Sequence, residues 1–249
     1  MDVISPDVSY QEYIVVRAEL KAYSPFEGVT FTKTLPLNEN YNIKKAELQN
    51  VTAYMRVNGT RIITLRYIQD GLYAPLDTIS IEPGSTYELF AQYNNTNIYS
   101  ITKVPRPPAI ISVSLIDNRF IEVMVRPNAD EVYGAGWEIY NAVSKNLYDE
   151  SSDFLTIVQP QPNDLGSNVA VDTKDLPSDY TSGSYDNLMY AQVYAFDSPY
   201  FNYFKSKNNN QPSENVFAQG GDQVSWNVYG DHVIGLFIGL AVVKYIKVN

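Results

Sequence analysis

The chain has 249 residues, and its 18 basic against 28 acidic residues give a formal net charge of −10. The 45% hydrophobic content excludes disorder as the main state, and the acidic charge argues against a nucleic-acid partner, which needs clustered Lys and Arg. Zero cysteines and a single histidine, His232, exclude thiol nucleophiles, disulfides and multi-His zinc sites within the chain. We therefore expect no cofactor.

The sequence carries neither a secretory signal nor a membrane span. It opens with the acidic, proline-punctuated segment Met1–Asp7, where a signal would have a basic stretch followed by an apolar one. The longest apolar run, Val233–Val243, is about half the length that a membrane-spanning helix needs, and its β-branched residues favour a buried strand. A cytosolic protein and an exported protein whose leader has been removed both fit this pattern.

Alternating apolar and polar residues predict a series of β-strands in the first part of the chain. Asn58-Gly59 links two such runs, and this pair is a strong hairpin signal because a type I′ turn needs two positive φ angles. About seven short strands fit residues 10–104, which we assign to an N-terminal β-sandwich spanning 1–104. The clearest runs are Val16–Ala22, Val29–Leu35, Asn50–Val57, Thr60–Ile68, Thr86–Tyr93 and Ile98–Val104.

A proline-rich segment, residues 105–109, follows and predicts a stiff linker, because proline removes the donors that a central strand needs. Beyond it, residues 110–249 are predicted to form a second β-sandwich of about seven strands. Ser198 and Pro199 then mark the start of a short amphipathic helix near 199–207. The predicted strands of this part are Ile111–Leu115, Ile121–Val125, Trp137–Tyr140, Phe154–Val158, Asn168–Asp172, Leu188–Phe196, Val224–Val228 and Val233–Val248.

The pattern as a whole predicts an all-β protein of two tandem immunoglobulin-like or fibronectin-III-like sandwiches with one short helix in the second. In such folds function resides in loops and exposed faces, and catalysis is the exception. His232 lies in a Gly-Asp-His turn, and no Gly-x-Ser-x-Gly elbow accompanies it, so we expect a solvated histidine and no hydrolytic triad. We predict no catalytic residues. A glycoside hydrolase that uses paired carboxylates remains a weaker alternative.

Two acidic loops, Asp149–Asp153 and Asp130-Glu131, have the oxygen ligands that calcium prefers. Neither has the spacing of an EF-hand loop, so ordinary solvated loops are expected and no metal site is predicted. Whether either loop binds calcium stays open at the level of sequence.

Tyrosine is in excess, with 21 residues, and it suits positions where the ring is buried and the hydroxyl is wet. Many of these tyrosines are expected to form cross-strand pairs. The densest aromatic cluster lies in the predicted helix, where four aromatic residues exceed what one buried face can hide. We predict a partner- or ligand-binding surface there, with packing against the adjacent sandwich as the alternative. Its residues are Tyr200, Phe201, Tyr203 and Phe204.

Several segments, taken in order, carry a family resemblance. They are Tyr13–Ala18, Asp70–Tyr73, Glu82–Leu89, Val104–Pro108, Tyr200–Lys205, Glu214–Phe217 and Gly235–Gly239. In this order the chain resembles the outer-membrane lipoproteins of Bacteroidota that form a domain-of-unknown-function family, often encoded beside TonB-dependent receptors. The glycine pair usual before the last segment is reduced here to Gly230, and the acylated cysteine is absent.

The resemblance implies a non-enzymatic lipoprotein of the outer membrane or cell surface, whose leader and anchoring cysteine lie outside this chain. It implies a partnership with an outer-membrane TonB-dependent transporter in nutrient uptake, and a glycan or a peptide is the expected ligand. The family supplies no catalytic residues. An adhesin or fimbrial structural subunit, in which exposed edge strands pair with neighbours, is the alternative function.

Overall fold

The computed structural model describes residues 10–36, 38–141, 143–151, 153–177, 187–209 and 224–248, and it confirms the predicted all-β class. Within these residues the α-helices α1 (Ile43–Ala46) and α3 (Pro199–Asn209) and the 3-10 helix η1 (Pro162–Asp164) accompany the strands. The strands are β1 (Ile14–Lys21), β2 (Val29–Lys33), β3 (Thr52–Val57), β4 (Arg61–Gln69), β5 (Leu72–Ala74), β6 (Thr86–Tyr93), β7 (Thr96–Lys103), β8 (Ala109–Ile116), β9 (Phe120–Arg126), β10 (Glu131–Asn141), β11 (Leu147–Glu150), β12 (Val169–Asp172), β13 (Asn187–Asp197), β14 (Val228–Tyr229) and β15 (Val233–Lys247). No helix of the described segments is long and apolar enough to cross a membrane.

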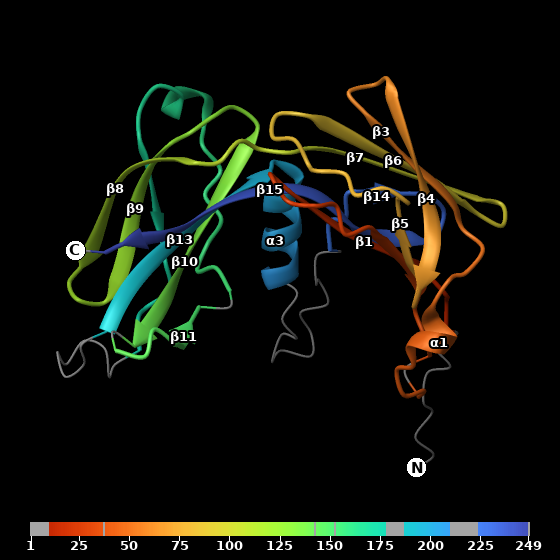
Figure 1. Ribbon diagram of the computed structural model, residues 1–249, viewed down its shortest axis with the longest axis horizontal. Helices are drawn as coiled ribbons and strands as arrows, with labels where there is room; N and C mark the ends of the chain where they lie inside the picture. The colour runs from red at the N-terminus through yellow and green to blue at the C-terminus, as the bar shows by residue number, and fades with distance from the viewer. Residues whose placement is uncertain are drawn as a thin grey trace, which may run out of the picture.

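The strands form two sheets (Figure 1). The larger has the order β11-β10-β13-β15-β1-β2-β5-β4-β3-β6-β7-β14, and the smaller has the order β12-β9-β8. The larger sheet bends around the apolar core of the first half, while the smaller one packs against β10 and β13 in the second half. Alternation explains most of both cores, because every second residue of a strand with one covered face points inward. The strand β10 is covered on both faces and is buried from Val132 to Ile139.

The long strand β15 joins the two halves. Its first part, Val233–Leu240, pairs in parallel with β1, and the part that follows pairs antiparallel with β13. Val228, Val233 and Phe237 accordingly belong to the core of the first half, although they come from the far end of the chain. The division at residues 105–109 stays a prediction, and the structure adds that the core of residues 14–104 is completed by residues beyond 227.

A polar network fixes the place where β15 crosses β7. Thr102 donates a hydrogen bond to the buried carboxylate of Asp197 at 2.8 Å, and the Lys103 backbone N–H donates to the same oxygen at 3.0 Å. The Gly239 N–H in turn donates to the Thr102 hydroxyl at 2.8 Å. A side chain at Gly239 would place its Cβ 2.7 Å from the Lys103 carbonyl oxygen, so only glycine fits this crossing.

Local predictions and the structure agree at the hairpin and the helix and differ elsewhere. Asn58 and Gly59 have φ angles of 50° and 72°, as the predicted type I′ turn requires. The strand expected over Phe154–Val158 is wrong: Val158 forms one isolated bridge with Tyr133, while Phe154 packs as a cover over the sheet. The strand expected over Val224–Val228 is wrong for residues 224–227, because only Val228 belongs to a strand, the two-residue β14. The helix α1 was not predicted, and the Asn42 side chain caps it by accepting a hydrogen bond from Lys44 N.

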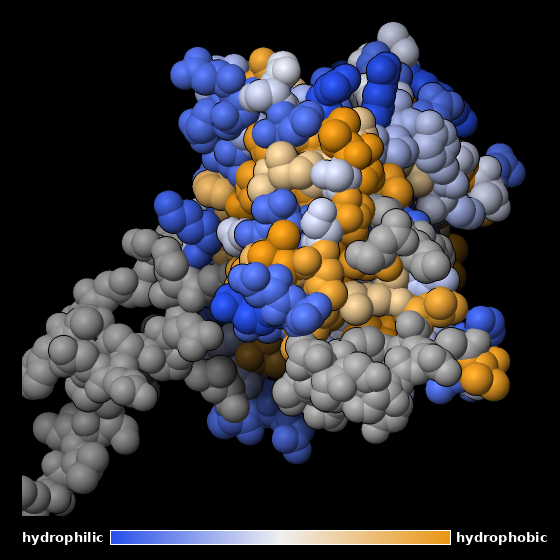
Figure 2. All heavy atoms as spheres, turned by 90° about the vertical axis from the view of Figure 1, so that its left-hand side faces the viewer, coloured by the Kyte–Doolittle hydropathy of each residue, from blue (hydrophilic) through white to orange (hydrophobic). Residues whose placement is uncertain are grey.

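The strand β8 covers the second core incompletely, because it lies at the edge of the smaller sheet. Ile110, Val113 and Leu115 are only half-buried against that core, and Ile111 is exposed. Figure 2 shows apolar side chains gathering at the surface on this end of the molecule.

Candidate functional site

The aromatic helix α3 lies directly against the sheet, between the two halves (Figure 1). Tyr200, Phe201 and Phe204 pack on a cluster formed by Val132, Ile157, Phe196 and Leu240. The ring of Tyr200 stacks on Phe196 with a centroid distance of 4.0 Å and an interplanar angle of 15°, and burial raises the pKa of Tyr200 to about 12. Three of the four predicted contact residues therefore pack on the molecule's own sheet.

The fourth residue, Tyr203, faces a cleft. Its ring lies 5.5 Å from the ring of Trp226, at an interplanar angle of 40°, and both rings line a cavity of about 520 Å³. This volume is within the range of small-molecule binding sites. Tyr203 and Trp226 are each half-buried, so part of each ring is available to a ligand.

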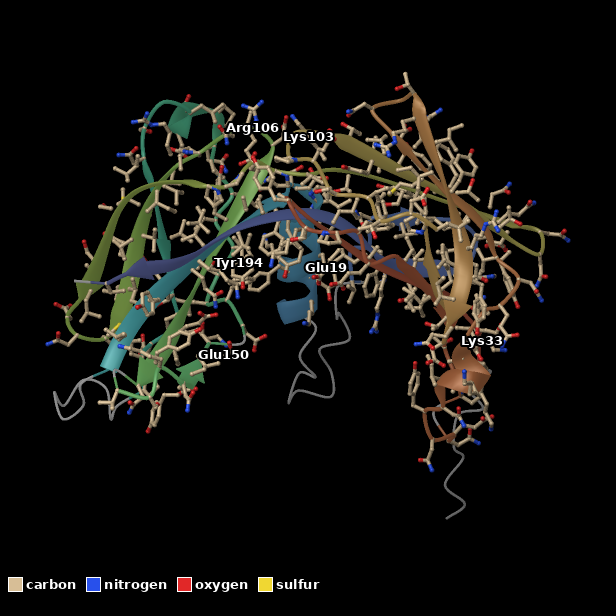
Figure 3. The ribbon with its side chains drawn as sticks, in the orientation of Figure 1. Glu19, Lys33, Lys103, Arg106, Glu150 and Tyr194 are labelled. Carbon is tan, nitrogen blue, oxygen red and sulfur yellow. The ribbon has the colours of Figure 1, made fainter. Side chains whose placement is uncertain are left out.

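The floor of the cleft is the outer face of the β1–β15 pair. Val15, Arg17 and Glu19 alternate along β1, and Ile234 and Leu236 alternate along β15. Because the two strands are in register, with Arg17 opposite Leu236, these side chains emerge on the same face. Figure 3 shows Glu19 on the side of the sheet where α3 lies. The floor is thus apolar along β15 and charged along β1.

Two hydrogen-bonded anchors hold Trp226 beside Tyr203. On one side, the Ser225 backbone N–H donates to the buried Ser206 hydroxyl of α3 at 2.8 Å. On the other, the Asn227 side chain donates to the Phe237 carbonyl at 2.6 Å and accepts from the Phe237 N–H at 2.9 Å. The short segment that carries Trp226 is therefore fixed both to α3 and to β15.

The two charged side chains of the cleft, Arg17 and Glu19, do not pair with each other. Within the described segments neither Arg17 nor Glu19 forms an ion pair, and none of those segments accepts a hydrogen bond from the Trp226 indole N–H. Residues two apart on a strand lie about 7 Å from each other, so both charges can reach a single small ligand in the cleft. A guanidinium that donates, a carboxylate that accepts and two aromatic faces together suit a ligand rich in hydroxyl groups.

The remaining sequence candidates lie elsewhere. His232 has an exposed side chain that hydrogen-bonds Gln11 and meets the ring of Tyr13 edge-on, and Asp231 lies 3.7 Å away. Asp197 is buried, which raises its pKa, but its oxygens are taken up by Thr102, Lys103 and Ser198. In the part of the chain that the structure describes, no three acidic or histidine side chains gather in a metal-binding arrangement.

The expected cross-strand tyrosine pairs form on the outer face of the first half. Tyr54, Phe90, Tyr99 and Tyr229 are direct neighbours across β3, β6, β7 and β14. Tyr54 stacks on Phe90 with centroids 5.0 Å apart, and Phe90 lies 5.1 Å from Tyr99. Arg56 covers the same Phe90 ring and pairs with Glu88 at 2.7 Å. Tyr54 and Phe90 stack face to face, whereas Phe90 and Tyr99 are tilted by 54°, and these ring contacts stabilise the sheet.

Trp226, Arg17 and Glu19 were not among the predicted site residues. In the sequence, Arg17 and Glu19 match the solvent-facing side of any strand. Trp226 is held beside Tyr203 by hydrogen bonds from Ser225 to Ser206 and between Asn227 and Phe237, which no local pattern indicates. The one signal available was that four aromatic residues in five cannot all be buried on one helix face, and it located Tyr203.

Fold and site define an all-β protein with an aromatic cleft between its helix and its main sheet. The chain belongs to the family described as Domain of unknown function (DUF4249), whose model matches residues 2–246. None of the curated proteins compared with the chain matches it. The expected membership of a family of unknown function is confirmed, while its bacterial group and its transporter neighbours stay predictions. The segment Glu214–Phe217, quoted for the resemblance, lies outside the described residues.

Proposed function

We propose that the chain is a non-enzymatic binding protein that holds a saccharide in the cleft between α3 and the β1–β15 pair. The observation that carries this proposal is the pair of half-buried rings, Tyr203 and Trp226, set over a floor with Arg17 and Glu19, neither of which forms an ion pair with a described residue. Sugars bind proteins by stacking their C–H faces on aromatic rings and by exchanging hydrogen bonds with planar charged groups.

Calorimetric titration of the protein with a panel of neutral and acidic oligosaccharides tests the proposal. We expect one sugar class to bind, with affinity lost at least tenfold in Trp226→Ala and Tyr203→Ala. Tyr229→Ala is the matched control, because Tyr229 is 60% exposed on β14 and does not line the cleft. Binding that survives both cleft substitutions, or the release of shorter sugars during incubation, would contradict a binding role at this site.

The cellular setting of the proposal comes from the family resemblance. In that setting the protein is a lipoprotein of the outer membrane or cell surface, anchored through a residue outside this chain, and it passes a captured nutrient to a TonB-dependent transporter. The acidic charge of −10 suits an exposed, solvated surface.

Fractionation of cells that produce the natural full-length protein, followed by affinity purification from the outer-membrane fraction, tests the setting. We expect an acylated protein in that fraction, accompanied by a transporter. An unacylated protein recovered from the cytosol would overturn the setting and leave the cleft proposal standing.

A further inference from the structure

The strand β4 has an open edge along half its length. On one side, residues Arg61–Leu65 of β4 pair with residues Ala53–Val57 of β3. On the other side β5 pairs only with Arg66, Tyr67 and Gln69, and β5 ends at Ala74. Within the described segments, Arg61–Leu65 is thus paired on one side only, and an unpaired edge offers backbone donors and acceptors to another strand.

A second extended segment faces this edge. The backbone groups of Ile79 and Ile81 bond to residues 23–26, through Phe26 N to Ile79 O and Ile81 N to Ser24 O, each at 2.9 Å. In an extended chain the groups of the intervening residue point the opposite way, so those of Ser80 are directed to the side on which β4 lies. Arg61–Leu65 and residues 78–82 therefore bound a space that we name the β4 slot.

The β4 slot is hollow along its length. Two cavities of about 280 Å³ and about 120 Å³ lie in it, and they share Arg61, Ile63 and Ile79 as lining residues. Apolar side chains stand open at its mouth, with Ile62 65% exposed and Leu76 71% exposed.

The charges of the slot indicate the kind of segment that fits. Arg61 and Arg66 are exposed, and neither forms an ion pair with a described residue, whereas Arg56 on the next strand is paired with Glu88. Asp77 and Glu82 also line the cavities, from the segment on the other side of the slot, and neither forms an ion pair with Arg61 or Arg66. The charged side chains of the β4 edge itself are both arginines, so two copies paired through β4 would set four arginines along one seam, whereas a strand that carries carboxylates meets opposite charge there.

We propose that the β4 slot binds an extended, acidic peptide segment of a partner protein by strand addition. The added strand bonds to the β4 edge through its main chain, lays its inward apolar side chains over Ile63 and Ile79, and places its outward carboxylates beside Arg66. Main-chain bonding supplies affinity, and the alternation of apolar and acidic side chains supplies specificity. The site is separate from the aromatic cleft and does not depend on the saccharide proposal.

Fluorescence anisotropy with defined peptides tests the inference. The probe is a labelled nine-residue peptide in which valine and glutamate alternate, and the comparison peptides replace glutamate by lysine or methylate alternate backbone nitrogens. We expect the lysine peptide to bind at least tenfold more weakly and the methylated peptide not to bind. Arg66→Glu should reverse the preference, while Arg119→Glu, an exposed arginine of the second half, and Trp226→Ala should change nothing.

Hydrogen exchange locates the contact. With the glutamate peptide bound, amide exchange should slow in Arg61–Leu65 and at Ser80. Equal binding of the glutamate and lysine peptides, indifference to backbone methylation, or unchanged exchange along β4 would overturn the proposal. Light scattering that shows a dimer sealed by this edge would overturn it as well, because the occupant would then be a second copy.

Discussion

The crossing of β15 over β7 gives a prediction whose size follows from the structure. In Gly239→Ala the new Cβ would lie 2.7 Å from the Lys103 carbonyl oxygen and 2.8 Å from the Val104 Cα, both backbone atoms, whereas ordinary contact begins at 3.4 Å. Rotamer changes cannot relieve such contacts, so the strands must separate. Overpacking of this kind costs about 1 to 3 kcal/mol.

Separation also lengthens the hydrogen bond from Gly239 N to Thr102 Oγ1, which is 2.8 Å and contributes about 1 kcal/mol. Alanine restricts the unfolded chain and returns about 0.5 kcal/mol. The net loss is about 2.5 kcal/mol in the free energy of unfolding, or roughly 5 to 10 °C in melting temperature for a chain of this size.

Urea unfolding followed by circular dichroism measures this loss as a lower midpoint at constant slope. Gly59→Ala is the contrasting variant: its Cβ meets no atom within 4 Å, and it loses only the backbone strain of φ +72°, about 1 kcal/mol. If Gly239→Ala were as stable as the natural protein, β15 would not cross β7 at this residue, and the account of the joint would fail.

Three further substitutions probe the cluster under α3 and the buried or paired carboxylates. Tyr200→Ser removes a ring stacked on Phe196 and should cost about 2 to 3 kcal/mol in urea unfolding; an unchanged midpoint would make that ring a free contact surface. Burial raises the pKa of Asp197 above its ordinary 3.8. Between the pKa of the unfolded chain and the higher pKa of the folded protein, the folded state keeps a proton that the unfolded state has lost, so stability falls as pH rises across that interval. Asp197→Asn should flatten that part of the pH profile, and an unaltered profile would assign it to other groups. The Arg56 hydrogen bond lowers the pKa of Glu88 below its ordinary 4.5. Glu88→Gln should therefore cost about 1 kcal/mol of stability at pH 7 and progressively less as pH falls below 4.5. An equal cost at every pH would exclude the ion pair as its source.

Much of the fold could be predicted because its signals are local. Alternation located β1, β3, β4 and β6, and a dipeptide located the hairpin turn between β3 and β4. The error at Phe154–Val158 arose because a short apolar run suits a covering segment as well as a strand. The pairing of β15 with β1 could not be predicted, because a period of two says which residues point inward and does not say which strand lies alongside.

The cleft could be predicted only in part, for the same reason. Tyr203 was found through the crowding of aromatics on α3, but its partner Trp226 is positioned by Ser206 and by a clamp onto Phe237. Those contacts span two separate elements. Arg17 carries no local mark that separates a residue of a binding floor from any other solvated strand residue.

The parallel pairing of β1 with β15 governs the order in which the protein can mature. Among the described strands β15 is the last to be synthesised, so a nascent chain holds β1 with one neighbour missing until residues 233–240 have been made. The first strand of the larger sheet thus gains its second neighbour only from the last one. A premature stop at residue 232 would therefore damage the beginning of the molecule as severely as its end, by removing Val233 and Phe237 from the first core.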